Sequence, residues 1–196
     1  MKKIFLVAIC SIGFALSHAQ NTIYPEGLKV GDKAPAIVGK DNSGKTFNLN
    51  QQLKKGAVVV IFYRGQWCPF CNKELSYLND SLAMIAGKGA SVVAISPETM
   101  QNVEKTVTKT KAAFPIISDS SMTIMKAWNV NFAVDDNTQT RYKKFGLDFM
   151  EVNGNNGANL PVPATYIIGK DGNIKYVFFN PDYKKRASVK DILEHL

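Results

Sequence analysis

Residues 57–71 read AVVVIFYRGQWCPFC, and the remainder of the sequence is interpreted around this stretch. Ala57 to Tyr63 form an unbroken run of small, β-branched and aromatic residues, which is typical of a strand buried on both faces of a parallel or mixed sheet. Gly65 interrupts the run, and Pro69 suits the first position of a helix, where no N–H is required. We therefore expect a core strand, a short loop and a helix that begins beside two cysteines.

Cys68 and Cys71 stand where that helix begins. Unpaired N–H groups and the positive end of the helix dipole stabilise a thiolate there, so the thiol pKa falls. The pattern predicts thiol–disulfide exchange, in which one thiolate attacks a partner's disulfide and the neighbouring cysteine resolves the mixed disulfide. A structural disulfide across so short a loop would contribute little through chain entropy. A zinc site would need more ligands than His195 supplies, so we expect no metal or other cofactor.

Residues 1–20, MKKIFLVAICSIGFALSHAQ, have the pattern of a secretory signal peptide. Two lysines precede an apolar run that ends at Leu16, and small residues precede Gln20. The run is shorter than the roughly 20 residues that a spanning helix needs, so we favour cleavage over a retained membrane anchor. The sequence around Cys10 does not favour lipid attachment. We expect residues 1–19 to be removed, and the protein to be exported, in a periplasm, without stable membrane insertion.

The composition indicates one globular domain, which we place at residues 20–196. The chain has 196 residues, of which 45% are hydrophobic, and a net charge of +8. Loss of residues 1–19 removes Lys2 and Lys3 and one of three cysteines, so the charge falls to +6 and the redox pair holds the only thiols. The small basic clusters at 141–144 and 184–186 are typical of solvated faces, and we expect no nucleic-acid partner.

The rest of the sequence predicts an α/β fold: a mixed central sheet, helices on both faces and an N-terminal β-hairpin extension. Residues 129–160 read as an irregular region with a helix near 141–146. The other expected elements are a hairpin over 36–49, helices over 72–87, 97–109, 121–128 and 187–196, and strands over 91–96, 114–117, 164–168 and 174–179.

The stretch QWCPFC (66–71), together with LPVPATY (160–166) before a later strand, resembles the thioredoxin superfamily. The wider frame, with GDKAP (31–35), FYRG (62–65) and VFFNPDY (177–183), resembles the AhpC/TSA peroxiredoxin-like family. The resemblance covers residues 28–196 and implies a thioredoxin-like fold. It also implies that Pro163 is a cis proline placed against the cysteine pair.

The active-site pattern departs from that of peroxiredoxins, whose Pro-x-x-x-Thr-x-x-Cys would place Arg64 at the proline, Cys68 at the threonine and Cys71 at the peroxidatic cysteine. Two reactions follow from the resemblance. In TlpA-like exported thioredoxins, Cys68, as the more accessible thiol, would attack a protein redox partner and Cys71 would resolve, maintaining redox balance in the cell envelope. In a peroxidase, a hydroperoxide would oxidise Cys71 to a sulfenic acid, and Cys68 would resolve it. We favour dithiol exchange, because the Cys-x-x-Cys and the proline loop both fit it. A redox-inactive binding module is a third alternative.

Three neighbours complete the predicted site. Trp67 is expected to shield one side of it. Glu74 stands where TlpA-like proteins often hold an acid that could move the thiol proton, but the simpler interpretation is a first-turn acid that favours the helix dipole. Arg64 would either supply a cation for peroxide activation or be a loop arginine in a surface ion pair.

Overall fold

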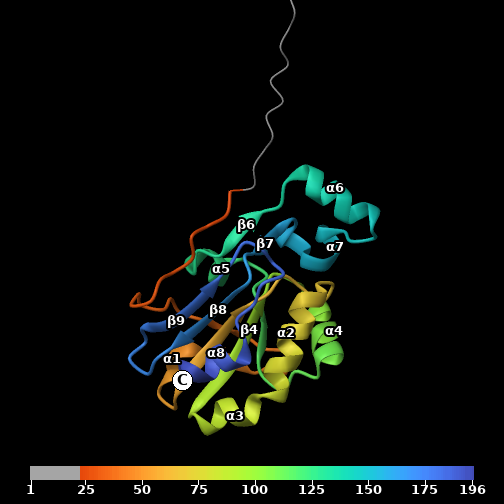
Figure 1. Cartoon of the computed structure of the whole chain (residues 1–196). Coiled ribbons are helices and arrows are strands. Elements are labelled where there is room, and N and C mark those ends of the chain that lie inside the picture. The colour runs from red at the N-terminus through yellow and green to blue at the C-terminus, as the bar shows by residue number, and fades with distance from the viewer. Residues whose placement is uncertain (1–22) are drawn as a thin grey trace, which may run out of the picture.

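The computed structural model describes residues 23–196 (Figure 1). The predicted signal peptide lies outside this range, so export stays a prediction. Within the described range, none of the helices has the length and apolar character needed to cross a membrane.

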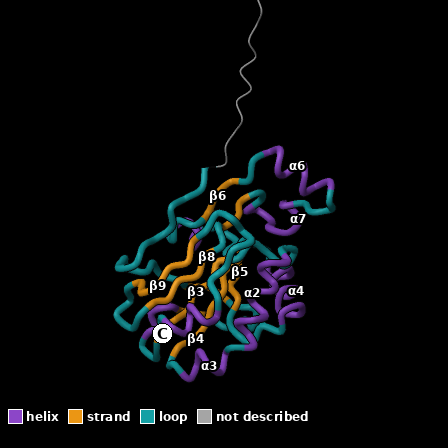
Figure 2. Tube along the Cα trace, in the orientation of Figure 1, coloured by secondary structure: helices purple, strands orange, loops and turns teal. Residues whose placement is uncertain are grey.

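The core of the described chain is a five-stranded mixed sheet in the order β5-β4-β3-β8-β9 (Figure 2). Its parallel half comprises β3 (Ala57–Phe62), β4 (Ala90–Ser96) and β5 (Ile116–Ser118). The antiparallel half comprises β8 (Ala164–Ile168) and β9 (Ile174–Phe179). β3 is the central strand, and all of its residues after Ala57 are buried, as the continuous apolar run predicts.

Helices cover both faces of the sheet, as expected. Apolar side chains of α2, α3, α4 and α8 pack with Val59 and Ile61 on one face, and those of α1 and α5 pack with Val58 and Val60 on the other. Alternate residues of β3 therefore point to opposite layers. The bounds are α1 (Leu49–Leu53), α2 (Pro69–Asp80), α3 (Leu82–Gly87), α4 (Met100–Thr110), α5 (Thr123–Ala127) and α8 (Val189–Glu194).

The helix predicted over 72–87 is two helices, and it starts earlier. α2 begins at Pro69 because Cys68 caps it, with its sulfur accepting the Cys71 N–H. The chain leaves helical geometry at Ser81, which ends α2 and precedes α3. Asn79, Asp80 and Ser81 are residues that compete with helical hydrogen bonds, which accounts for a break at this point.

The N-terminal hairpin forms as predicted from β1 (Val38–Lys40) and β2 (Thr46–Asn48). Its turn reaches the outer edge of β5. The Asn42 N–H donates to the Ile116 carbonyl at 3.0 Å, and the Asn42 side-chain oxygen accepts the Ile116 N–H at 2.9 Å. The hairpin therefore occupies hydrogen-bonding groups that an edge strand would otherwise expose.

The region 129–160 is more regular than its sequence suggests. It contains β6 (Asn131–Ala133), α6 (Asp136–Lys144), α7 (Phe149–Asn153), a 3₁₀ turn (Gly154–Asn156) and β7 (Asn159–Pro161). β6 and β7 pair antiparallel outside the central sheet, and Figure 1 shows α6 and α7 beyond one end of that sheet. Trp67 packs against this region, so residues 129–160 extend to the predicted active site.

The expectation that Pro163 is a cis proline is wrong, because the described chain contains no cis peptide bond. The trans form is the lower-energy form of most X–Pro bonds. Here the chain also runs extended from β7 into β8, with the Val162 N–H donating to the Val130 carbonyl at 2.8 Å. Pro163 lines a hollow together with Arg64.

Candidate active site

Cys68 lies at the N-terminus of α2, as predicted. Its sulfur accepts a hydrogen bond from the Cys71 N–H at 3.4 Å. Hydrogen bonding from Cys71 is the largest influence on this thiol and, with the charges of Arg64 and Arg186, outweighs burial and lowers the Cys68 pKa to about 7. A substantial fraction of Cys68 is therefore thiolate at neutral pH.

Cys71 is held in the opposite protonation state. Burial raises the pKa of this thiol, and the hydrogen bond that it donates to Cys68 acts in the same direction. Both cysteines are free. Cys68 is 1% exposed and Cys71 is 0% exposed, so the expectation that Cys68 is the more accessible thiol is wrong. The pKa values do distinguish them: Cys68 is the more readily ionised thiol, and Cys71 needs assistance to lose its proton.

Arg186 provides a cation at Cys71. Its Nη2 donates to the Cys71 sulfur at 3.3 Å, and its Nε donates to Glu74 Oε2 at 2.6 Å. The same guanidinium donates to the Tyr183 carbonyl, which fixes it to the loop after β9. The interpretation of residues 184–186 as a solvated face is therefore wrong for Arg186, whose side chain is 11% exposed. A basic run in a sequence does not reveal which member folds inward.

Glu74 is not a first-turn acid. Because α2 starts at Pro69, Glu74 lies in the second turn, and its side chain is 6% exposed in an ion pair with Arg186. The Thr165 hydroxyl donates to Glu74 Oε1 at 3.5 Å. Burial outweighs the attraction of Arg186 and raises the pKa of Glu74 to about 8. This carboxyl can therefore take up and return a proton near neutral pH, beside Cys71.

Arg64 is not in a surface ion pair either. It is 5% exposed, and its guanidinium lies 4.7 Å from the ring centre of Trp67 and 4.3 Å from that of Tyr183. Its Nη2 donates to the Tyr142 hydroxyl at 2.7 Å. Trp67 packs against the apolar cluster that contains both cysteines, and its predicted role in shielding the site stays a prediction.

Glu98, which the sequence did not single out, is a second buried acid next to the site. It is 0% exposed, and its Oε2 accepts the Gln66 N–H at 2.8 Å. Burial raises its pKa to about 8. The glycine at position 65 makes room for it, since a Cβ there would lie 2.6 Å from Glu98 Oε1 and 2.5 Å from Trp67 Nε1.

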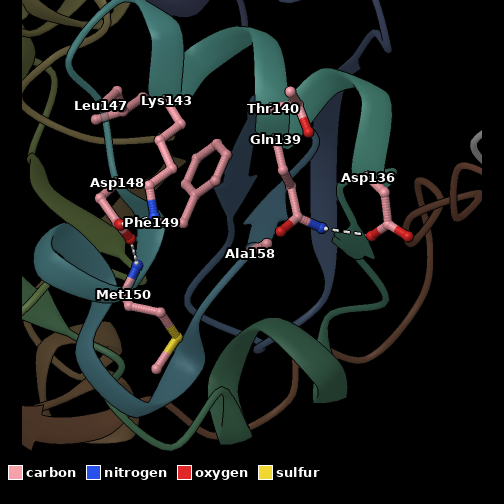
Figure 3. Close-up of a pocket in the computed structure, with 9 residues that line it drawn as sticks. All are labelled: Asp136, Gln139, Thr140, Lys143, Leu147, Asp148, Phe149, Met150 and Ala158. Atoms are coloured by element: carbon pink, nitrogen blue, oxygen red, sulfur yellow. Dashed lines mark hydrogen bonds and ion pairs between the residues drawn. The ribbon is translucent and has the colours of Figure 1, made fainter.

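A hollow of about 390 Å³ lies between α6 and α7, and neither cysteine lines it. Figure 3 shows Lys143 and Asp148 side by side at one end of it, where they form an ion pair of 3.0 Å. Its lining holds neither cysteine, so this hollow is separate from the predicted redox pair.

The family model that matches the sequence is that of the AhpC/TSA family, over residues 30–177. The thiol-disulfide oxidoreductase ResA of Geobacillus thermodenitrificans is 24% identical over 194 residues, which cover 98% of this chain and 90% of that protein. The chloroplastic peroxiredoxin Q of Populus jackii is 29% identical over 180 residues, covering 92% of this chain and 73% of that protein. Relatives of both kinds are thiol-dependent enzymes, which confirms the predicted enzyme class and leaves both predicted reactions in place.

Solved structures confirm the thioredoxin-like fold. The peroxidoxin BcpB of Mycobacterium tuberculosis superposes with a TM-score of 0.66 at 21% identity, covering 86% of this chain and 96% of that one. A peroxiredoxin-like protein from Aquifex aeolicus gives a TM-score of 0.63 at 19% identity, covering 86% and 85%. With a family model that spans most of the chain and a matching fold, this protein belongs to the AhpC/TSA family.

Proposed function

We propose that the protein is an exported dithiol oxidoreductase in which Cys68 is the nucleophile and Cys71 the resolving thiol. The observation that carries this assignment is the opposite tuning of the two sulfurs. Cys68 caps α2 and its pKa falls to about 7, whereas burial raises the pKa of Cys71. In a nucleophile–resolver pair, the first thiol must be ionised before the partner arrives and the second only afterwards.

The reaction consists of two displacements. The Cys68 thiolate attacks one sulfur of a partner disulfide, whose S–S bond breaks and whose second sulfur leaves as a thiolate. Cys71 then attacks the Cys68 sulfur, the mixed disulfide breaks, and the partner leaves fully reduced. Two electrons pass from Cys68 and Cys71 to the partner, and the reverse sequence oxidises a partner dithiol.

Glu74 and Arg186 support the second displacement. Cys71 must lose a proton to attack, and Glu74, with a pKa raised to about 8, accepts it at neutral or slightly alkaline pH. Arg186 donates to the Cys71 sulfur at 3.3 Å and stabilises the resulting thiolate. The ion pair between Arg186 and Glu74 keeps both groups at that sulfur.

Reduction of a protein disulfide by the mature chain tests this function, with insulin as the substrate. We expect Cys68→Ser to abolish turnover and Cys71→Ser to stop at a mixed disulfide on Cys68, detectable by intact-protein mass spectrometry. Full insulin reduction by Cys68→Ser would refute the assignment of the nucleophile.

Peroxide reduction is the second candidate, and Arg186 is the observation that favours it. A guanidinium against the Cys71 sulfur could bind a hydroperoxide and stabilise the leaving oxygen. Cys71 would attack the peroxide, form a sulfenic acid and release water, and Cys68 would displace a second water to form the disulfide. Stopped-flow mixing with hydrogen peroxide distinguishes the candidates: rapid sulfenate formation at Cys71 that persists in Cys68→Ser supports the peroxidase.

Export is part of the proposal and rests on residues 1–19, whose pattern is that of a cleavable signal peptide. The partner would then be a thiol–disulfide protein of the periplasm. N-terminal sequencing of the protein purified from the periplasmic fraction should begin at Gln20. Retention of Met1 in the cytoplasmic fraction would refute export.

A further inference from the structure

Arg64 is a buried cation whose charge is not matched by a neighbouring carboxylate. The residue is 5% exposed, and within residues 23–196 no acidic oxygen lies within ion-pair distance of it. The Tyr142 hydroxyl accepts from its Nη2, while its Nε is buried with no partner in the described part of the chain. Burial of an arginine usually comes with an anion, because desolvation of a lone charge is costly.

Arg64 lines a hollow of about 190 Å³. Tyr142, Tyr183 and Pro163 give it aromatic and apolar walls, and Arg141 adds a second cation at its lining. Asp135 also lines the hollow, where its carboxylate caps α6 by accepting the Thr138 N–H at 2.9 Å. Two guanidinium groups against one carboxylate leave the hollow positive. It is smaller than the roughly 300–1,000 Å³ of drug-sized sites, so its size suits a ligand of a few heavy atoms.

Arg64, which lines the hollow, and the proposed nucleophile Cys68 flank one short loop. Arg64 precedes Cys68 by a single loop, and the Cys68 N–H donates to the Gly65 carbonyl at 3.0 Å. The Arg64 charge is also close enough to contribute to the lowered pKa of Cys68. An anion on Arg64 would therefore bind at one end of the loop that ends at Cys68, within the range over which the Arg64 charge acts on that sulfur.

We propose that Arg64 and its hollow form a binding site for the carboxylate of a small disulfide, which is thereby presented to Cys68. A planar guanidinium held by aromatic rings is suited to binding carboxylate through two parallel hydrogen bonds. One half of the disulfide occupies the hollow, and the other half leaves. This inference rests on the proposed dithiol exchange and adds the class of substrate to it.

The reaction balances as a two-electron transfer. The Cys68 thiolate attacks the disulfide, whose S–S bond breaks, and one carboxylate-bearing thiolate leaves and takes a proton from water. Cys71 then displaces the second from Cys68. The products are two small thiols and the Cys68–Cys71 disulfide.

The test compares two disulfides of similar size, 3,3′-dithiodipropionate, which carries carboxylates, and bis(2-hydroxyethyl) disulfide, which is neutral. Second-order rate constants are measured with the reduced mature protein, and their ratio is divided by the same ratio for dithiothreitol, which removes the intrinsic reactivity of each disulfide. We expect a normalised preference of about tenfold for the carboxylate, as befits one charge-assisted hydrogen-bonded pair.

Arg64→Gln should reduce that preference to about one. Because the readout is a ratio, a change in the Cys68 pKa affects both substrates alike. Lys73→Gln is the matched control: it removes one exposed positive charge from α2 outside the hollow and should leave the preference unchanged. If Arg64→Gln does not fold, Arg141→Gln, on the exposed part of α6, should still lower the preference by about half as a second cation is lost.

A wild-type ratio near one, an unchanged ratio in the folded Arg64→Gln protein, or an equal loss in Lys73→Gln overturns the proposal. Saturation-transfer NMR with propionate separates it from the proposed function, since it detects binding without turnover. If neither disulfide is reduced but propionate binding disappears in Arg64→Gln, the exchange reaction is wrong and the anion site stands. Propionate binding that survives in Arg64→Gln refutes the site.

Discussion

The guanidinium of Arg186 lies 3.3 Å from the sulfur of Cys71, although 115 residues separate them in the sequence. The contact joins the loop after β9 to the first turn of α2. It places a cation at the thiol with the higher pKa. Two nitrogens of the same guanidinium donate hydrogen bonds, Nη2 to the Cys71 sulfur and Nε to the Glu74 carboxylate. The thiol with the higher pKa therefore has a cation from the C-terminal part of the chain as its neighbour.

Replacement of Arg186 by Gln should slow resolution and weaken the fold. The Cys71 thiolate loses its donor, so mixed disulfides on Cys68 should persist longer, as measured by quenched-flow mass spectrometry. Glu74 remains buried without its partner, which should cost about 1–3 kcal/mol in urea unfolding. Lys185→Gln, at an exposed neighbour, should change neither quantity. Unaltered mixed-disulfide decay in Arg186→Gln would contradict the role of this cation.

Replacement of Glu74 by Gln should change the pH profile of resolution. The wild-type decay of the mixed disulfide should accelerate as pH rises toward 8, because Glu74, with a pKa raised to about 8, becomes a base only on losing its proton. In Glu74→Gln the rise in the decay rate should occur at higher pH, where Cys71 ionises unaided. Superimposable profiles would mean that Glu74 only holds Arg186 in place.

The ionisation of Cys68 can be measured directly by alkylation. Iodoacetamide should modify Cys68 with a midpoint near pH 7, since hydrogen bonding from Cys71 lowers the pKa of Cys68 to about 7. Cys71→Ala removes the largest cause of that shift and should move the midpoint upward. Peptide mass spectrometry identifies the modified cysteine, and preferential labelling of Cys71 below pH 8 would reverse the assignment of nucleophile and resolver.

Glu98 should make the fold less stable as pH rises. Burial raises its pKa from 4.5 to about 8, so the folded state binds this proton more tightly than the unfolded chain does. The stabilisation is complete below about pH 4.5 and is lost as pH rises through 8. Glu98→Gln should therefore show a smaller fall in Tm between pH 5 and 9 than the wild type. Glu74 titrates in the same window, so some of the slope should remain.

Gly65→Ala should destabilise the protein through the loop that precedes Cys68. The backbone there has φ of +151°, and a Cβ would lie within 2.7 Å of both Glu98 and Trp67. We expect a loss of about 1–3 kcal/mol in urea unfolding, together with slower reaction at Cys68. Gly87→Ala is the matched control, since a Cβ at Gly87 meets nothing within 4 Å. Equal stability of the two variants would show that the loop relaxes around the methyl group.

The sequence predicted the sheet well because local and tertiary signals agree there. Val58 to Phe62 form a continuous apolar run, which can be buried on both faces only as a central strand of the sheet. The split between α2 and α3, the early start of α2 and the elements inside residues 129–160 depend on weaker signals. α6 has no buried residue, so no apolar periodicity could predict it. Its local signals are the Asp135 cap, an acidic residue in its first turn and three basic residues in its last turn.

The chemistry was predictable up to the cysteines, and what surrounds them was not. The redox chemistry could be predicted from Cys68 and Cys71 themselves, because their spacing and the neighbouring residues indicate where the helix begins. Arg186 and Glu98 reach the site only through tertiary packing, and nothing in a run of three basic residues marks the third as buried. The bond before Pro163 is trans, the form that most X–Pro dipeptides favour, and the cis expectation came from the family resemblance and not from the dipeptide.

The hydrogen bonds between Asn42 and Ile116 also bear on how copies of this protein behave in solution. A strand at the rim of a sheet invites a second molecule to add its own strand, and chains of such additions grow into aggregates. The hairpin turn prevents that growth along β5 by supplying both an acceptor and a donor from within the same molecule. At the opposite rim, Gly31 and Asp32 hydrogen-bond Ile174 at the start of β9, so that rim too is partly occupied from within the molecule.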